Sequence, residues 1–375
     1  MRVLMLSPHP KVTGPLPKHT PVLVQALRDE GCTVDTVGWG RHDDEDSVAS
    51  RIASRLRDMS RIRRLVLRGK YEIVVVKTSH EWVSMGRDLP LLVALRRAPP
   101  ILVLQFHGGR SDKLAGPGSL MFKGASRALF ELCDGVLMLS SEEVGYAEAF
   151  YPRGTFRVVD NPYVVSSKLA NGHSYGAAYG RRQSASCPSD RVPSILFVGR
   201  LIEEKGVVDL VEAFARVRGA RPCRLVVAGR GPADAEVRQR SGLLGVADDV
   251  TLSGQMSTQE LYELYRQSDV FVLPTYWAEG FPTVITEAMS AGLPVVTTRH
   301  RGMADHLTEE ENALFVPPRK PVDLAMAINR LLDDGALRTR MGKANTVKVQ
   351  HFAPQVVARR YVQTLEDIAT RAGRR

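Results

Sequence analysis

Short apolar runs alternate with amphipathic segments along most of the chain. The runs are rich in β-branched side chains, as in "EIVVVKT" (72–78) and "SILFVGR" (194–200). Runs of this kind are typical of parallel strands that are covered by helices on both faces. The pattern predicts strands at 2–8, 33–39, 72–78, 101–107, 135–140 and 156–162, and then at 194–200, 223–229, 249–254, 270–274, 294–299 and 313–318.

This alternation stops once, over a stretch at 166–190 that is rich in Ser, Gly and Ala and has no apolar periodicity. Such a composition is typical of a connection between domains. The chain has 375 residues, more than one core usually supports. We therefore expect an α/β protein with two Rossmann-like, doubly wound parallel-sheet domains, 1–165 and 193–352, facing a central cleft. A linker at 166–192 would join them, and a C-terminal helix at 353–375 could cross back to the first domain.

The composition is that of an ordinary globular enzyme, with 44% hydrophobic and 25% charged residues. No apolar run is long enough to span a membrane, and the N-terminal "MRVLMLSPHP" is broken too early by proline to be a signal peptide. The cysteines show no metal-ligand or disulfide spacing; they are Cys32, Cys133, Cys187 and Cys223. These features predict a cytoplasmic protein.

The positive charge is concentrated in one segment. The chain carries a net charge of +10, and residues 51–70 contain eight basic residues and one acidic residue. Apolar residues recur there every three or four positions, which predicts an amphipathic helix with an arginine-rich outer face. This face is either simply solvated, or it contacts an anionic surface such as lipid headgroups at the inner face of the cell membrane. Nucleic acid is disfavoured as a partner, because no aromatic residues are interleaved with the basic ones.

Two cations follow the first strand of the second half. Arg200 comes directly after "SILFVG", and Lys205 stands just before Gly206, where a helix is expected to begin. Cations at a strand end beside a helix N-terminus can bind an anion of the size of a diphosphate. The alternative is an ordinary pair of surface charges.

A second candidate element is "EGFPTVITE", in which Glu279 and Glu287 stand eight residues apart. Pro282 fits the first turn of a helix, and the amides of residues 283–285 would then be available to an anion. On one helix the two glutamates would be about 80° and about 12 Å apart. Ionised carboxylates accept hydrogen bonds, so the two acids suit hydroxyl groups on either side of a diphosphate. The pattern indicates a nucleotide sugar.

These segments resemble glycosyltransferase family 4, whose members are retaining enzymes of the GT-B fold. The resemblance lies in "FVGRLIEEKGVVDLVEAF", "VVAGRGP" and "LSGQMSTQELYELYRQSDVFVLPTYWAEGFPTVITEAMSAGLPVV", and more weakly in "LQFHGG", "CDGVLMLS" and "RVVDNPY". It implies that Arg200 and Lys205 bind the donor diphosphate, that Glu279 and His107 lie at the donor sugar, and that Glu287 binds the ribose. The catalytic residues would be Glu279, His107, Arg200 and Lys205. The other donor-binding positions that it implies are Gly229, Gly231, Gln255, Met256, Gly280, Phe281, Pro282, Thr283 and Gly14.

The resemblance also implies the reaction. A sugar would pass from a nucleotide-diphosphate donor, with UDP favoured and GDP next, to an acceptor hydroxyl with retained configuration and without a metal or other cofactor. The acceptor would be a growing surface polysaccharide, a lipid-linked glycan or a small natural product. One departure is the first loop, where Gly14 stands alone and Pro15 and Pro17 remove amides. The acids at 43–46 are expected to open a helix rather than to bind a metal.

Other functions stay open on the sequence alone. An epimerase on the same fold would need further acid–base groups beyond His107. A non-catalytic subunit could bind a nucleotide sugar without turnover. A membrane-surface adaptor would bind lipid through residues 51–70.

Overall fold

The described part of the chain forms two compact units. The computed structural model describes residues 1–9, 15–40, 48–98, 100–116, 119–163 and 191–373. Unit 1 consists of Met1–Val164, Ala278–Gly280 and Phe352–Arg375, and unit 2 of Val165–Trp277 and Phe281–His351. Unit 1 is therefore built from chain segments on both sides of unit 2.

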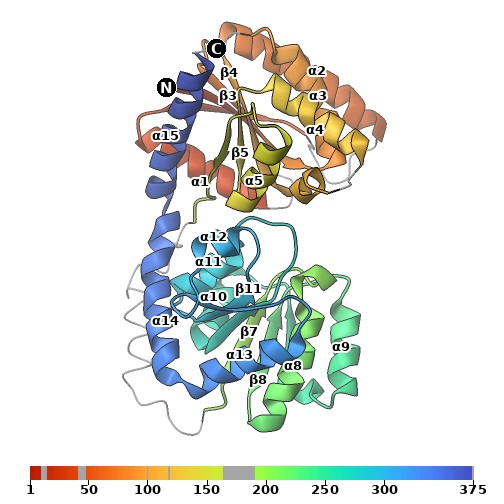
Figure 1. Ribbon diagram of the computed structural model, residues 1–375, viewed down its shortest axis with the longest axis vertical. Helices are drawn as coiled ribbons and strands as arrows, with labels where there is room; N and C mark the ends of the chain where they lie inside the picture. The colour runs from red at the N-terminus through yellow and green to blue at the C-terminus, as the bar shows by residue number, and fades with distance from the viewer. Residues whose placement is uncertain (10–14, 41–47, 99, 117–118, 164–190, 374–375) are drawn as a thin grey trace. The chain divides into compact units, whose positions relative to one another are not determined.

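Unit 1 contains a six-stranded parallel sheet with the order β2-β1-β3-β4-β5-β6 (Figure 1). Its strands are β1 Arg2–Ser7, β2 Thr33–Gly38, β3 Ile73–His80, β4 Ile101–Gly109, β5 Gly135–Met138 and β6 Phe156–Val158. Its helices are α1 Pro15–Asp29, α2 Val48–Arg68, α3 Trp82–Leu95, η1 Ser111–Leu114, α4 Leu120–Leu132, α5 Ser141–Phe150 and α15 Pro354–Ala372. Helices α1 and α15 pack on one face of the sheet, and α2, α3 and α4 pack on the other.

Unit 2 has a second six-stranded parallel sheet, with the order β12-β11-β10-β7-β8-β9. Its strands are β7 Ser194–Val198, β8 Arg224–Ala228, β9 Val250–Gly254, β10 Val270–Leu273, β11 Val295–Thr298 and β12 Ala313–Val316. Its helical elements are η2 Glu203–Lys205, α8 Val207–Ala220, α9 Asp234–Leu243, η3 Ala247–Asp249, α10 Thr258–Gln267, α11 Thr283–Ser290, α12 Gly302–His306, α13 Pro321–Asp333, α14 Gly335–Lys348 and η4 Val349–Phe352.

The fold class predicted from the sequence is confirmed. Each predicted strand appears within a residue or two of its expected start. Central strands such as β7 and β10 are buried at every position, as parallel strands covered on both faces require, whereas the edge strands β2 and β9 are partly exposed. No helix in the described ranges is long and apolar enough to cross a membrane.

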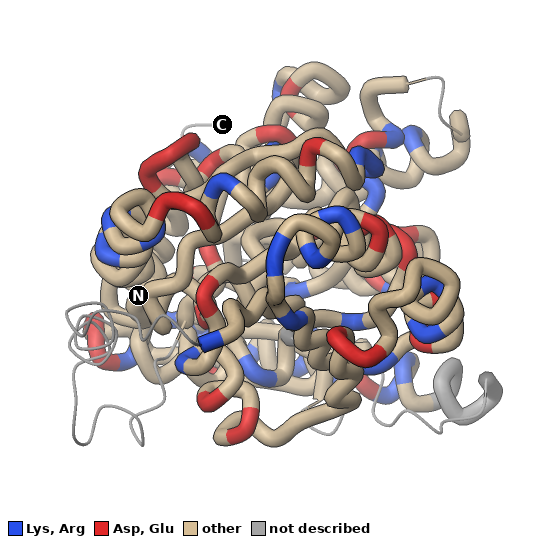
Figure 2. Tube along the Cα trace, turned by 90° about the horizontal axis from the view of Figure 1, so that it is seen from below, with Lys and Arg blue, Asp and Glu red and all other residues tan. Residues whose placement is uncertain are grey.

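Charged residues of both signs are interspersed along the chain, as the blue and red segments of Figure 2 show. Helix α2 departs from this mixture, since its sequence holds seven arginines and one aspartate. Ile62 and Val66 of α2 are buried in the core of unit 1, while most of its described arginines are exposed.

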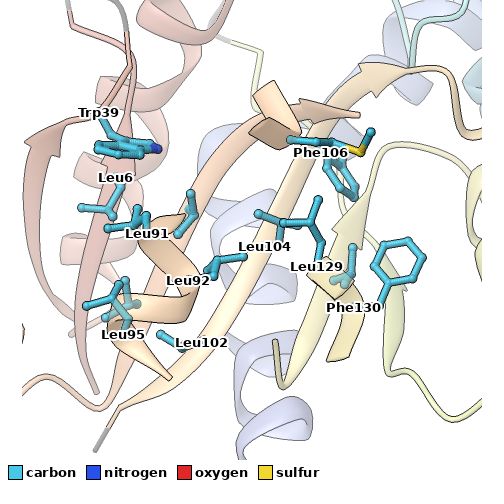
Figure 3. Close-up of a cluster of buried hydrophobic side chains, with 14 of the residues drawn as sticks. Leu6, Trp39, Leu91, Leu92, Leu95, Leu102, Leu104, Phe106, Leu129 and Phe130 are labelled. Carbon is cyan, nitrogen blue, oxygen red and sulfur yellow. The ribbon is translucent and has the colours of Figure 1, made fainter. Parts of the chain in front are cut away.

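The core of unit 1 has one layer on each face of its sheet. The layer beneath α2, α3 and α4 includes Trp39, Phe106 and Phe130 (Figure 3). Trp39 is 1% exposed, and its indole N–H donates to Asp88 Oδ1 at 2.7 Å. The buried indole therefore keeps a hydrogen-bond partner, as a polar group in a core requires.

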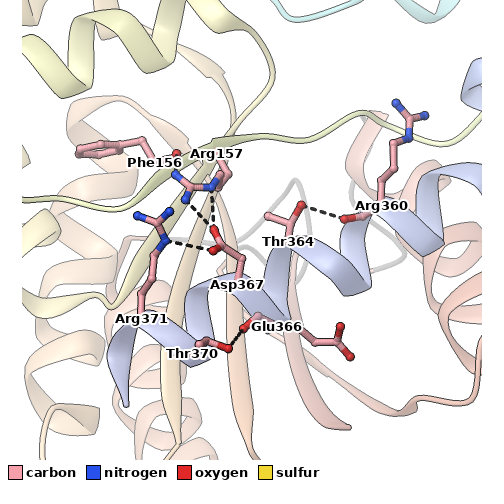
Figure 4. Close-up of polar contacts among 8 residues, drawn as sticks. All are labelled: Phe156, Arg157, Arg360, Thr364, Glu366, Asp367, Thr370 and Arg371. Atoms are coloured by element: carbon pink, nitrogen blue, oxygen red, sulfur yellow. Dashed lines mark hydrogen bonds and ion pairs between the residues drawn. The ribbon is translucent and has the colours of Figure 1, made fainter. Parts of the chain in front are cut away.

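Helix α15 completes the opposite layer and is also held by polar contacts. Arg157 of β6 and Arg371 of α15 both donate to the Asp367 carboxylate, at 2.6 Å and 3.0 Å (Figure 4). These groups are half-exposed, so the ion pairs contribute little. The buried contact is stronger, because the Tyr361 hydroxyl donates to Gln105 Oε1 of β4 at 2.8 Å.

Candidate functional site

The two strand-end cations lie in a loop of unit 2 whose backbone conformation requires a glycine at position 206. Arg200 follows β7 and is exposed, while Lys205 ends the short turn η2 and is half-buried. Gly206 then adopts φ 71°, and a Cβ there would lie 2.5 Å from the carbonyl oxygen of Pro274. Glycine is required at this point, and it places Lys205 directly before the N-terminus of α8.

The loop after β8 packs directly on the loop after β7. Gly229 has φ 147°, and a Cβ there would clash with the carbonyl oxygen of Gly199. A Cβ on Gly231 would clash with the carbonyl oxygen of Leu201, and the Leu201 amide donates to the Arg230 carbonyl at 3.0 Å. These glycines thus hold the segment that carries Arg200 in place.

The segment after β10 is bonded to the turn that carries Lys205. The Tyr276 amide and the Thr275 hydroxyl both donate to the Glu204 carbonyl, at 2.8 Å and 3.2 Å. The Thr298 hydroxyl of β11 donates to the Thr275 carbonyl. The ends of three neighbouring strands are therefore bound into one edge of the sheet.

The helix α11 begins later than the sequence suggested. Its first residue is Thr283, and Pro282 is the N-cap with φ −65° and ψ 131° rather than a first-turn residue. Glu279 therefore lies in the loop before the helix, and the expected separation of two glutamates on one helix was wrong. The Phe-Pro pair keeps residue 281 out of the helical conformation, as a residue before proline prefers.

Glu287 remains inside α11 and is oriented by a tyrosine that the sequence reasoning missed. The Tyr265 hydroxyl of α10 donates to Glu287 Oε2 at 2.8 Å, and Tyr265 is 1% exposed. Phe281 packs edge-on against the His306 ring, with the ring centroids 5.0 Å apart. The beginning of α11 is thus held from two sides.

Gln255 and Met256 follow β9, and Gln255 is exposed while Met256 is half-buried. They precede a capping box in which Ser257 and Glu260 bond each other's backbone amides at the start of α10. The box fixes where these two residues leave the sheet.

In unit 1, His107 lies near the carboxyl end of β4. Its Nε2 atom is buried and has no hydrogen-bond partner in the described structure. Burial lowers the pKa of His107 well below its ordinary value, and the nearby Lys77 and His19 lower it further. The imidazole is therefore neutral near pH 7, with one nitrogen to donate and one to accept.

Glu279 and Gly280 group with unit 1. A Cβ on Gly280 would clash with the Leu139 side chain. Glu279 and His107 thus belong to the same unit, whereas Arg200, Lys205 and Glu287 belong to unit 2. Gly14 lies outside the described residues, as do the acids at 43–46.

No group of three or more His, Cys, Asp or Glu side chains within the described ranges is arranged to hold a metal ion. The candidate groups of the site in unit 2 are two cations after β7 and a carboxylate on α11. Glu203 and Glu204 lie between the cations in η2, and Glu203 is paired with Arg319 at 3.1 Å. The two cations and the carboxylate on α11 can bind an anion and a neighbouring hydroxyl.

The two doubly wound parallel-sheet units match solved structures of the GT-B fold. The structure resembles sucrose-phosphate synthase from Thermosynechococcus elongatus with a TM-score of 0.75 and 23% identity, over 98% of each chain. It also resembles Anabaena HepE in complex with UDP-glucose, with a TM-score of 0.70 and 17% identity, over 98% of this chain and all of that one. At such identities the likeness shows the fold.

The comparison of sequences concerns mainly unit 2. Residues 183–348 match the family model Glycosyl transferases group 1. Alpha-D-kanosaminyltransferase from Streptomyces kanamyceticus is 36% identical over 155 residues, which are 41% of this chain and 40% of that protein. The chain thus spans less than half the length of the curated relatives it matches. The family resemblance expected from the motifs is confirmed at this level.

Proposed function

We propose that the protein transfers a sugar from a nucleotide-diphosphate donor to an acceptor hydroxyl with retention of configuration. The observation that carries this proposal is the edge of the sheet in unit 2. Arg200, Lys205 and the start of α11 all follow the carboxyl ends of its central strands, where open α/β sheets bind ligands. UDP is the favoured nucleotide of the donor and GDP the next, and one structural relative is a complex with UDP-glucose.

Each element has a part in this proposal. Arg200 and Lys205 hold the diphosphate, together with the amides and dipole at the start of α11. Glu287, oriented by Tyr265, accepts hydrogen bonds from the ribose hydroxyls. Glu279 and the neutral His107 contact hydroxyls of the donor sugar.

The chemistry that follows is electrostatic. Breaking the bond between sugar and phosphate leaves negative charge on the diphosphate. Fixed cations stabilise this charge as it develops, without a metal. We assign no enzymic nucleophile: the acceptor hydroxyl attacks the sugar carbon as the bond to the diphosphate breaks, and its proton passes to the leaving diphosphate.

The acceptor would be a surface polysaccharide or a lipid-linked glycan. A small natural product is the second candidate, since a relative at 36% identity is named as a kanosaminyltransferase. The protein would then work in the cytoplasm, at or near the inner face of the membrane.

The test is a screen of the purified protein for binding and slow hydrolysis of UDP-, GDP- and ADP-sugars. The informative variants are Arg200→Ala and Glu287→Gln. The matched control is Arg224→Ala, because Arg224 is exposed at the opposite, amino end of β8.

One donor is expected to raise the melting temperature of the wild type and of the control, and to be hydrolysed by both. Removing a charge-assisted contact with a phosphate should weaken binding by about 1.5–3 kcal/mol, roughly 10- to 150-fold, in Arg200→Ala. If no nucleotide sugar binds the wild type at millimolar concentration, or if the control loses binding equally, the proposed function is wrong.

A further inference from the structure

Four large apolar side chains are exposed at the beginnings of α3 and α4. Their exposed fractions are 42% for Trp82, 77% for Val83, 86% for Leu120 and 75% for Met121. The Trp82 ring lies edge-on to Phe122 with the centroids 5.6 Å apart, so the two helix starts are neighbours. We call Trp82, Val83, Leu120 and Met121 the apolar patch.

The apolar patch lies at the carboxyl edge of the sheet in unit 1. Helix α3 begins two residues after β3 ends, and α4 follows β4 and the turn η1. The loops at this edge are those that a doubly wound sheet uses for ligands. An apolar surface at this place is a sign of a partner, because soluble proteins rarely gather exposed apolar side chains without a function.

The neighbouring helix α2 of the same layer is basic. Helix α2 packs against α3, and its exposed arginines are Arg57, Arg61, Arg63, Arg64 and Arg68. Leu56 and Leu67 of the same helix are also exposed, at 60% and 53%. Beside the patch, the Lys113 ammonium lies 5.8 Å from the centre of the Phe122 ring.

Acidic residues are fewer in this layer. Asp58 is the single acidic residue of α2, and Glu81 precedes Trp82. The other described acids of α3, η1 and α4 are paired with arginine: Asp88 with Arg87 at 2.7 Å, Asp112 with Arg110 at 3.6 Å and Glu131 with Arg127 at 2.9 Å. An apolar patch in the same layer as an arginine-rich helix has the composition of surfaces that lie in the interface of an anionic bilayer. A folded protein partner would not require so strong an excess of one charge.

We propose that the layer formed by α2, α3 and α4 docks on an anionic lipid bilayer, with the apolar patch entering the boundary between headgroups and acyl chains. The arginines of α2 supply attraction to the headgroups, and the patch supplies the apolar contact. Combined with the proposed function, on which this last step rests, the docking surface implies a lipid-anchored acceptor.

The test uses fluorescence and flotation with vesicles. In a Trp277→Phe background, Trp82 is the one tryptophan that is more than slightly exposed, because Trp39 is 1% exposed. The protein is mixed with vesicles of phosphatidylcholine and phosphatidylglycerol, or of phosphatidylcholine alone, at low and high ionic strength. The patch variant is Val83→Ser with Leu120→Ser and Met121→Ser.

The matched control is Leu243→Ser with Met326→Ser, since these residues of unit 2 are 72% and 66% exposed. We expect flotation with the anionic vesicles and a blue shift of the Trp82 emission. The patch variant should partition about tenfold less or worse, because it loses the apolar transfer free energy of three side chains. The control should behave as the wild type.

Two results would overturn the proposal. One is the absence of flotation with anionic vesicles at low salt. The other is flotation that is equal in the patch variant and gives no blue shift, which would mean electrostatic adhesion without insertion. Hydrolysis of the donor by the patch variant is measured without vesicles. If the patch variant keeps hydrolysis and floats less than the wild type, the docking surface is supported. If the wild type hydrolyses the donor but does not float, only the docking surface is wrong; if neither the wild type nor any variant binds a donor, the proposed function fails independently.

Discussion

The buried Lys77 leads to a quantitative prediction of how the free energy of unfolding changes with pH. Its side chain is 1% exposed on β3, and its ammonium has a long hydrogen bond of 3.4 Å to the Thr20 hydroxyl. Burial lowers the pKa of Lys77 from 10.5 to about 7. The folded protein therefore disfavours the charged lysine, whereas the unfolded chain keeps it protonated up to pH 10.5.

The size and sign of the effect follow from this difference. The two pKa values differ by about 3.5, and at about 1.36 kcal/mol for each pKa unit the cost of protonating folded Lys77 is about 5 kcal/mol, an order-of-magnitude figure. Between pH 7 and pH 10.5 the unfolded state binds more protons, so stability rises with pH in this window. The contribution is present above pH 10.5 and is lost as the pH falls through about 7.

The assay compares the wild type with Lys77→Met, which replaces the lysine by an uncharged side chain of similar length. Both carry Trp82→Phe and Trp277→Phe, so that the buried Trp39 alone reports the unfolding of unit 1 in urea. From pH 7 to pH 10 the wild type should gain roughly 3 kcal/mol of unfolding free energy relative to the variant.

Lys18→Met, a change of an exposed lysine on α1, is the control for introducing a methionine. If the difference between wild type and Lys77→Met stays constant within about 0.5 kcal/mol across this range, Lys77 does not titrate near pH 7 and the reasoning is refuted.

Three further changes test the site and the fold. Tyr265→Phe removes the hydrogen bond to Glu287, and should weaken nucleotide binding in calorimetry by about 1 kcal/mol, roughly fivefold; unchanged affinity would mean that the tyrosine does not orient the glutamate. Gly229→Ala should destabilise unit 2 by more than about 3 kcal/mol, because the new Cβ clashes with backbone at a positive φ. The control Gly242→Ala, in open space on α9, should stabilise unit 2 by about 0.5 kcal/mol. Both are measured by thermal unfolding in circular dichroism, and equal melting temperatures of the two variants would contradict the prediction for Gly229. Tyr361→Phe leaves a buried partner without its donor and should cost about 1–3 kcal/mol in urea unfolding; a loss below about 0.5 kcal/mol would show that the bond is replaced.

The strands could be predicted because strands buried on both faces have a locally apolar, β-branched composition. A run such as "SILFVGR" is apolar at every position since both faces of β7 are covered. The place of Arg200 after this strand, and of Lys205 before a glycine-opened helix, followed from the same pattern. Local sequence patterns are sufficient to predict strands and the residues that directly follow them.

Features that depend on distant residues could not be predicted in this way. Tyr265 reads as a core aromatic of an amphipathic helix, and its bond to Glu287 exists only after α10 and α11 have packed. Lys77 reads as a strand-end lysine, because the sequence does not show that α1 will bury it. The sequence pattern predicts Glu279 and Glu287 on one helix. It does not show that Pro282 is the N-cap, so that α11 begins only at Thr283 and Glu279 lies in the preceding loop.

The return of the chain from unit 2 to unit 1 has a consequence for biosynthesis. The face of the first sheet that α15 covers is built from β1, β3 and β4, which a ribosome makes early, whereas Tyr361, Leu365 and Ile368 of α15 come more than 250 residues later. At about 5–20 residues per second this face waits for at least roughly 13–50 s. During that interval unit 2 can be completed, but unit 1 exposes an apolar surface that a chaperone would recognise. A stop codon just before α15 should therefore harm the half of the protein that was made first.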